Sequence, residues 1–325
     1  MNKIFHATLV TVAICATLPF AASAGEITFA HGANPGNPRY DAANMFAALV
    51  PACTGGNMTV NVAPSATMGN DVEMLTSASS GVIEISANSQ GPLAQIVPEV
   101  GALGLPFLFS DLPSAWKVLD GPIGDIIDEK AQRAGLKVLT FWDNGIRNVT
   151  HVSKGISSPA DLKGMKIRTP PDEVTLAMFK ALGASPAPLA WSELPTALRS
   201  GAFDGQENPL TNIYSAKLHE ITPYISMTGH KYESTPVVAS LSWWSGLSAA
   251  EQSCVQGAAK QAGWYQRGLS LTQGQSLRAV MEKEGAKFTD VSDRQPFIAA
   301  TAGVYDEVDK KIGGGFVGKL RAAAK

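Results

Sequence analysis

Arg168 is the residue of this sequence best placed to bind an anion. It follows a short extended run, residues 165–167, and precedes Thr169, Pro170 and Pro171. Pro170 disfavours helical geometry at Thr169, so we expect the strand to end with the guanidinium at its tip. Ligands of open α/β sheets bind at that end of the strands. A guanidinium donates two parallel hydrogen bonds to a carboxylate, so Arg168 predicts a carboxylate site, with a structural salt bridge as the alternative.

Arg147, Asn144 and Asn208 are further candidate donors for such a site. Arg147 and Asn144 lie just past an expected strand, residues 137–142. Asn208 belongs to a Gln-Glu-Asn-Pro turn, and its amide can bond a carboxylate or a neighbouring hydroxyl. Acidic residues of the same turn could instead pair with either arginine, so structural salt bridges remain the alternative for both.

No motif for catalysis, a metal or a cofactor emerges from the sequence. The histidines are scattered without HExxH spacing, and no GxSxG motif is present. The run GGGFVGK at 313–319 lacks the Ser/Thr of a phosphate-binding loop. We therefore expect no catalytic residue, metal or cofactor. The competing hypothesis from another class is a secreted hydrolase or lyase with Asp204 and Glu207 as acid–base groups.

The first 24 residues predict export. Lys3 precedes an apolar stretch at 7–20, and Ala22-Ser23-Ala24 forms a small-residue cleavage site. This pattern is typical of a signal peptide cleaved after Ala24, and the apolar stretch is too short to span a membrane. We expect a periplasmic protein without stable membrane insertion. The net charge of −2 and the lack of basic clusters argue against nucleic-acid binding.

The remaining elements predict an α/β protein of two lobes. Roughly 300 residues after the leader exceed one hydrophobic core. The strand and helix patterns at 26–30, 38–53, 58–62, 70–80 and 82–87 alternate, which favours a mostly parallel sheet covered by helices. Helical patterns at 172–182 and 192–200 follow the Arg168 strand in the sequence. A Ser-x-x-Glu capping box at 248–251 opens a long helix that Gly285 would end.

Six phrases resemble the solute-binding proteins of tripartite ATP-independent periplasmic (TRAP) transporters in order and spacing. They are GNDVEMLTSASSG, LPFLF, NGIRN, DLKGMKIRTP, LGASPAPLAWSE and ALRSGAFDGQENP, spread over most of the chain. The resemblance implies a type II-like, two-lobed periplasmic binding protein, with several crossings and one long helix shared by both lobes. It implies lobe 1 at 25–144 plus 234–273, and lobe 2 at 145–233 plus 274–325.

The resemblance also implies roles for individual residues. Arg168 would hold the ligand carboxylate, and Trp191 would face the pocket, with core packing as its alternative. Asn88 would contact the distal end of the ligand; sialic-acid binders are acidic there, so its amide argues against that ligand. His31, Asn34 and Asp71 are weaker candidates, with loop or capping roles as alternatives.

The implied function is capture of an organic acid between closing lobes and its delivery to a TRAP membrane permease. A binding protein that serves a chemoreceptor or sensor is the alternative. The sequence leaves the acid unnamed among mono- and dicarboxylates, keto and hydroxy acids, uronates and sulfonates. Monomer or dimer, and a disulfide or two thiols at Cys53 and Cys254, also stay open.

Overall fold

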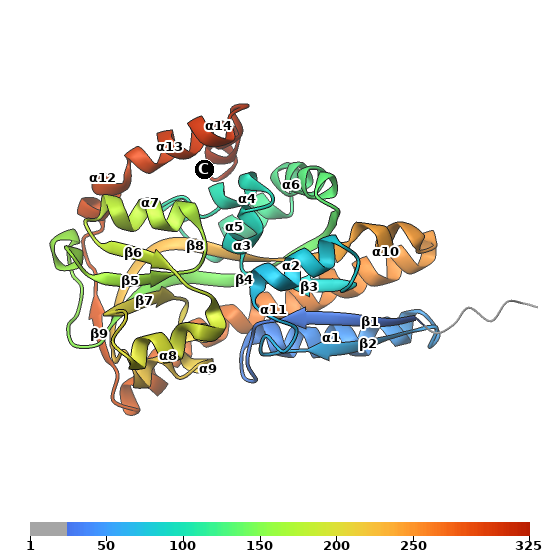
Figure 1. The fold of residues 1–325 in the computed structure, drawn as a ribbon, viewed down its shortest axis with the longest axis horizontal. Helices are drawn as coiled ribbons and strands as arrows, with labels where there is room; N and C mark the ends of the chain where they lie inside the picture. Colours follow the sequence, from blue (N-terminus) through green and yellow to red (C-terminus); the bar gives the residue numbers. More distant parts are fainter. Residues whose placement is uncertain (1–24) are drawn as a thin grey trace, which may run out of the picture.

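The computed structural model describes residues 25–325, so the predicted signal peptide lies outside the described residues. Its nine strands form one sheet in the order β2-β1-β3-β8-β4-β7-β5-β6, with β9 beside β8. The long strands β4 (Leu136–His151) and β8 (Tyr224–Ser240) pair antiparallel and run between the two ends of the sheet (Figure 1). Helices cover each end, which gives the two lobes expected from the sequence.

The first lobe is built on β1 (Gly25–His31), β2 (Met58–Ala63) and β3 (Ile85–Ala87), which pair in parallel. Helices α1 (Pro38–Cys53) and α2 (Asp71–Ser79) connect them. Both helices start where expected, because Asn37 and Asn70 are N-caps that accept backbone N–H groups. The predicted strand at 82–87 is shorter and begins only at Ile85.

The second lobe is built on β5 (Lys166–Thr169), β6 (Ser185–Pro188) and β7 (Gly205–Asn208), also parallel. Helices α7 (Glu173–Ala181), α8 (Leu194–Arg199) and α9 (Leu210–Ser215) pack around it. Each lobe therefore has the parallel strands that we predicted. The sheet as a whole is mixed, because β4 and β8 pair antiparallel with each other and with their neighbours β7 and β3.

Strand β4 corrects one prediction. We expected a strand that ends at Trp142, with Arg147 beyond it, but the strand continues to His151 and carries Arg147 in its interior. The pairing with β8 shifts register at three places, one of them between Asp143 and Gly145. Such bulges bend a strand without ending it. The run Asp-Asn-Gly, which resembles a turn in the sequence, is a bulge with Gly145 at φ 123°.

Helix α11 (Ala249–Lys283) extends for 35 residues along both lobes (Figure 1). Ser248 and Glu251 form the predicted capping box, and Gly285 at φ 101° follows its end. Its early part packs against α1 and β4, and its late part packs against α9 and β9 (Lys287–Asp290). The predicted helix shared by both lobes is confirmed.

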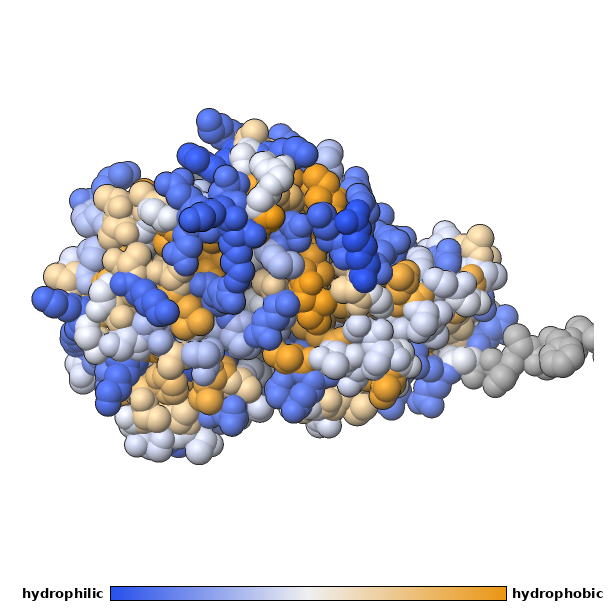
Figure 2. Space-filling view, turned by 45° about the horizontal axis from the view of Figure 1, so that its top comes forward, coloured by the Kyte–Doolittle hydropathy of each residue, from blue (hydrophilic) through white to orange (hydrophobic). Residues whose placement is uncertain are grey.

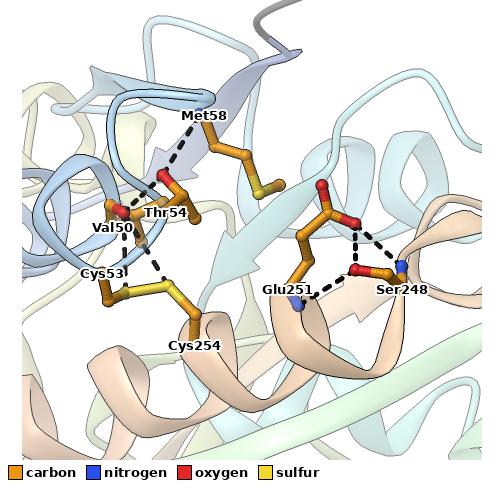
Figure 3. The surroundings of a disulfide bond; sticks show 7 residues. All are labelled: Val50, Cys53, Thr54, Met58, Ser248, Glu251 and Cys254. Carbon is orange, nitrogen blue, oxygen red and sulfur yellow. Dashed lines mark hydrogen bonds between the residues drawn. A yellow bond between two sulfur atoms is a disulfide. The ribbon is translucent and has the colours of Figure 1, made fainter. Parts of the chain in front are cut away.

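Cys53 and Cys254 form a disulfide that joins the end of α1 to the start of α11. Their Cα atoms are 5.8 Å apart, and 201 positions separate them in sequence. Figure 3 shows the bond beside the capping box of Ser248 and Glu251. The alternative of two free thiols does not apply in this structure.

The short helices α3 (Gln90–Ala94), α4 (Pro98–Ala102), α5 (Leu112–Leu119) and α6 (Pro122–Arg133) follow the first-lobe strands. The chain ends in α12 (Gln295–Thr301), α13 (Gly303–Ile312) and α14 (Phe316–Ala323). Val304 of α13 and Phe316 and Leu320 of α14 share an apolar cluster with residues of α4, α5 and α6. The C-terminal segment, which we expected in lobe 2, thus also packs on lobe 1, and the lobe boundaries stay a prediction.

Figure 2 shows polar side chains over much of the face that carries the C-terminal helices, with apolar side chains grouped near its centre. The remaining short elements are α10 (Leu241–Gly246) and the 3₁₀ turns η1 (Pro159–Leu162), η2 (Trp191–Glu193) and η3 (Leu218–Glu220). Within residues 25–325, no helix is both long and apolar enough to cross a membrane.

Candidate ligand-binding cleft

A cleft of about 370 Å³ lies between the lobes. Its walls come mainly from the segments at and after the ends of β1, β2, β3, β5, β6 and β7, because the carboxyl ends of these parallel strands face the crevice between the lobes. The side chains of the wall that carry polar groups are Asn34, Asn37, Arg39, Asn70, Asp71, Ser89, Arg147, Arg168, Trp191, Glu193, Asn208, Asn212 and Ser215.

Arg168 is buried in this wall, with 2% of its surface exposed. Its Nε and Nη2 donate to the carbonyl oxygen of Leu189 at 2.9 and 2.6 Å. Among residues 25–325, no carboxylate lies within ion-pair distance of Arg168, whereas two pair with Arg147. Burial lowers the pKa of Arg168 to about 10, so the guanidinium stays charged at neutral pH. A buried cation without a counter-ion is costly, and a ligand carboxylate would remove that cost.

Arg147 has its partners within the protein. Its Nε and Nη2 donate to the carboxylate of Glu207, and its Nη1 donates to Glu233. His230 Nε2 lies 3.2 Å from Glu207 Oε2. Although Arg147 lines the cleft, these two carboxylates occupy its donors. The alternative that the sequence offered for Arg147, a structural salt bridge, describes its position in this structure.

The surroundings of Asp204 and Glu207 test the hypothesis that these two residues act as acid–base groups of an enzyme. Arg147 and His230 overcome the effect of burial and lower the pKa of Glu207 to about 2, so this carboxylate is ionised and holds no proton to donate. Asp204 Oδ2 accepts the backbone N–H of Lys166 at 2.8 Å. Neither residue lines the cleft. The arrangement does not suit the hydrolase or lyase hypothesis.

A chain of amides connects the lobes beside the arginines. Asn212 Nδ2 donates to Asn208 Oδ1 and to Asn144 Oδ1, both at 3.0 Å. Asn37 Nδ2, from the first lobe, donates to Asn212 Oδ1 at 2.8 Å. Asn208 Nδ2 donates to Gln206 Oε1 at 2.5 Å. Asn208 lies on the cleft surface as predicted, whereas Asn144 lies behind it and supports Asn212.

Trp191 connects the two lobes beside the cleft. Its indole Nε1 in the second lobe donates to Gly32 O of the first lobe at 3.1 Å. The ring is part of the cleft wall and also packs against an apolar cluster of the second lobe, so its position fits both the pocket-facing role and the alternative of core packing. Together with the Asn37–Asn212 bond, this contact holds the lobes against each other across the cavity.

The first-lobe candidates divide into two groups. Asp71 and Asn34 line the cleft, whereas His31 and Asn88 lie behind it. In the amide orientation that satisfies both of its ends, Asn88 donates to Asp71 Oδ1 at 3.1 Å. His31 Nδ1 accepts the N–H of Ala33 at 3.1 Å, and burial with the nearby charge of Arg39 lowers the His31 pKa to about 3. His31 is therefore a neutral residue that shapes the loop.

Arg39 is a cleft residue that we did not predict. Buried at the start of α1, it donates from Nη2 to Thr235 Oγ1 at 2.9 Å and to Asn144 Oδ1 at 3.3 Å. The sequence Asn37-Pro38-Arg39 resembles an ordinary exposed helix start. A signal was nevertheless present, because a cation in the first turn of a helix opposes the helix dipole and needs compensation nearby.

Residues 25–325 contain no group of three or more His, Cys, Asp or Glu side chains that could hold a metal ion. The cleft offers guanidinium, amide and indole donors together with two carboxylates, the half-buried Asp71 and the exposed Glu193. Donors of this kind fit an oxygen-rich anion of small size.

Comparisons with known proteins place this chain and its fold among binding proteins. The model for "bacterial extracellular solute-binding protein, family 7" matches residues 29–311. An uncharacterized protein of Sinorhizobium fredii is 44% identical over 300 residues, which is 92% of this chain and 55% of that protein, so this chain spans about half of it. The 2,3-diketo-L-gulonate-binding periplasmic protein of Escherichia coli is 34% identical over 275 residues, covering 85% of this chain and 84% of that one.

A solved structure of a binding protein also has the same fold. The sugar acid binding protein of Advenella mimigardefordensis, in complex with galactonate, superposes with a TM-score of 0.89 at 33% sequence identity. The match covers 92% of this chain and 97% of that one.

Proposed function

Because this chain belongs to family 7 of the bacterial extracellular solute-binding proteins, the binding proteins of TRAP transporters, we propose that it binds a small organic acid through Arg168. The ligand carboxylate would accept hydrogen bonds from the guanidinium and from the amide of Asn208. Trp191 would close over the ligand from the second lobe. The bound acid would then pass to a TRAP membrane permease.

The observation that carries this proposal is the state of Arg168. Its guanidinium is buried beside a cavity, and its only hydrogen-bond acceptor among residues 25–325 is the Leu189 carbonyl oxygen. That carbonyl fixes the orientation of the fork but leaves the positive charge without an anion. A carboxylate supplies both the charge and the planar geometry that a guanidinium matches.

Binding would act through the contacts between the lobes. A ligand stabilises the closed arrangement only by its greater affinity for that arrangement. The Trp191–Gly32 and Asn37–Asn212 bonds cross between the lobes, and each contributes about 1 kcal/mol to holding them together. A ligand bound between the lobes would add an ion pair with Arg168 to these two hydrogen bonds.

The test is ligand binding by the purified exported protein, refolded to remove any acid carried through purification. Calorimetry and thermal-shift assays would use a panel of organic acids that includes galactonate and 2,3-diketo-L-gulonate. Arg168→Met should weaken binding about 30-fold or more, because it removes the charged partner of a buried carboxylate. Arg199→Met, at the exposed end of α8, is the matched control and should bind as the natural protein does. Undiminished binding by Arg168→Met, or no response to any acid, would reject the proposal.

Service to a permease, rather than to a chemoreceptor or sensor, predicts that deletion of the gene abolishes uptake of the labelled acid; loss of chemotaxis alone would favour the alternative. Export with cleavage after Ala24 predicts a periplasmic protein whose N-terminus is Gly25, which mass spectrometry of the purified protein would check.

A further inference from the structure

Asp71 is an acidic residue in a cleft that we propose for anions. It is the first residue of α2, and its carboxyl group forms part of the first-lobe wall. It packs closely on the loop after β1, since a Cβ added to Gly32 would lie 3.1 Å from Asp71 Oδ1. Asn88 donates to the same oxygen at 3.1 Å. The carboxylate is therefore held in place by the protein and cannot swing away from an incoming ligand.

The charges that face Asp71 come from four elements. Arg39 of α1 and Arg168 of β5 attract it, Glu233 of β8 repels it, and the backbone N–H of Ser89, just before α3, donates to it. These are the same two arginines that have no carboxylate within ion-pair distance among residues 25–325. Asp71 thus shares the positive field that a ligand carboxylate would use.

Two cations of the cleft wall, Arg39 and Arg168, have no carboxylate within ion-pair distance among residues 25–325. Asp71 lines the same wall and faces both of them. One ligand carboxylate at Arg168 would therefore balance the second of these two positive charges, but a further carboxylate would be an uncompensated charge next to Asp71.

On this basis we infer that Asp71 selects ligands by charge: it excludes a second carboxylate and favours acids whose other end carries hydroxyl groups. A fixed carboxylate accepts hydrogen bonds from hydroxyls but repels a second anion. The favoured ligands are hydroxylated monocarboxylates, such as sugar acids, and dicarboxylates are disfavoured. This inference rests on the proposed function, because it assumes that one carboxylate binds at Arg168.

Proton binding gives the inference an independent readout. Burial raises the pKa of Asp71, and Arg39 and Arg168 oppose that rise. A bound ligand anion would engage Arg168 and add negative charge, so it would raise this pKa further. Ligand binding should therefore be accompanied by proton uptake at and above the ordinary aspartate pKa of about 3.9, and affinity should fall as the pH rises through this range.

The experiment compares two pairs of acids that differ in one group. Galactonate and galactarate share a six-carbon chain, and 4-hydroxybutanoate and succinate share a four-carbon chain; the second member of each pair carries the extra carboxylate. Affinities would be measured by calorimetry on the refolded, ligand-free protein at several pH values, in buffers of different ionisation enthalpy. Asp71→Asn keeps the shape and removes the charge. Asp41→Asn is the matched control, since Asp41 also lies in the first turn of a first-lobe helix but is not part of the cleft.

We expect the natural protein to prefer the monocarboxylate of a pair by about tenfold or more, and Asp71→Asn to lose this preference and the proton uptake. Asp41→Asn should retain both. A natural protein that binds both members of a pair equally, or an Asp71→Asn variant with an unchanged ratio, would overturn this inference while the proposed function stands. If neither pair binds but another acid of the panel does, that acid is compared with an analogue that keeps its first carboxylate. The two compounds then differ only at the far end, where one carries CH₂OH and the other a second carboxylate. If no acid of any kind binds, the proposed function fails and this inference fails with it.

Discussion

Arg147 and Arg168 are two buried arginines of the same cleft with opposite surroundings. Arg147, in the long strand that joins the lobes, meets Glu207 and Glu233. Arg168, at the end of a second-lobe strand, meets a carbonyl oxygen and the cavity. The first charge is compensated when the chain folds, and we propose that the second is compensated when a ligand binds. A buried arginine near a cleft is therefore no sign of binding until its partners have been identified.

The largest effect should come from removing the compensated charge. Arg147→Leu leaves Glu207 and Glu233 buried without their cation, so the free energy of unfolding should fall by about 3–5 kcal/mol. Urea unfolding of the ligand-free protein measures this. A loss below about 1 kcal/mol would mean that the two arginines do not differ in the way described.

The pH dependence of stability should sharpen the same contrast. Arg147 and His230 hold the pKa of Glu207 at about 2, below its ordinary value. A depressed carboxylate pKa contributes stability above the unfolded-state pKa of about 4.3, and this contribution is lost as the pH falls toward 2. Between about pH 4.3 and 2, the free energy of unfolding should fall with decreasing pH in the natural protein. It should fall less in Glu207→Gln, which has no carboxylate to protonate at this position. Parallel curves would contradict the assignment.

Arg168→Met should barely change the stability of the ligand-free protein. The substitution removes hydrogen bonds to Leu189 O but also a costly buried charge, so we expect a change within about 1 kcal/mol in either direction. Urea unfolding without and with ligand would show the difference, since only the natural protein should gain stability from the acid. A loss as large as that of Arg147→Leu would make Arg168 a structural residue.

The smallest effect concerns the contact that closes the cleft. Trp191→Phe keeps an aromatic ring but removes the hydrogen bond to Gly32 O. We expect ligand affinity to fall by about 1 kcal/mol, or roughly fivefold, mainly through faster dissociation. Stopped-flow measurement of the dissociation rate is the test, and an unchanged rate would show that the indole N–H has no part in closure.

Local signals made much of the fold predictable. The N-cap and Pro38 define the start of α1, and the capping box with Gly285 defines both ends of α11. The bulge after Asp143 could not be predicted, because it depends on pairing with a strand some 90 residues later. Strand β6 was missed since Pro186 and Pro188 argue against a strand, and only its position at the sheet edge permits them.

The cleft was predictable where a residue's position follows from its own strand. Arg168 follows from the strand end on which it lies. The Gln-Glu-Asn-Pro run around Asn208 was predicted as a turn, but it forms strand β7, whose pairing with β4 and β5 the local sequence does not show. Arg39 and Asn212 could not be found in this way, because their importance comes from neighbours supplied by the other lobe or by the crossing strands. The role of Arg147 depended on Glu233, which the sequence gives no reason to place beside it.

The disulfide between Cys53 and Cys254 closes a covalent ring that contains the whole stretch 54–253. Strands β5, β6 and β7, and both strands that cross between the lobes, belong to this ring. A protease that cuts a loop of the second lobe once would therefore open the ring without releasing a fragment. The nicked protein would gain only the mass of one water, and its two pieces would stay joined through Cys53 and Cys254 until the disulfide was reduced.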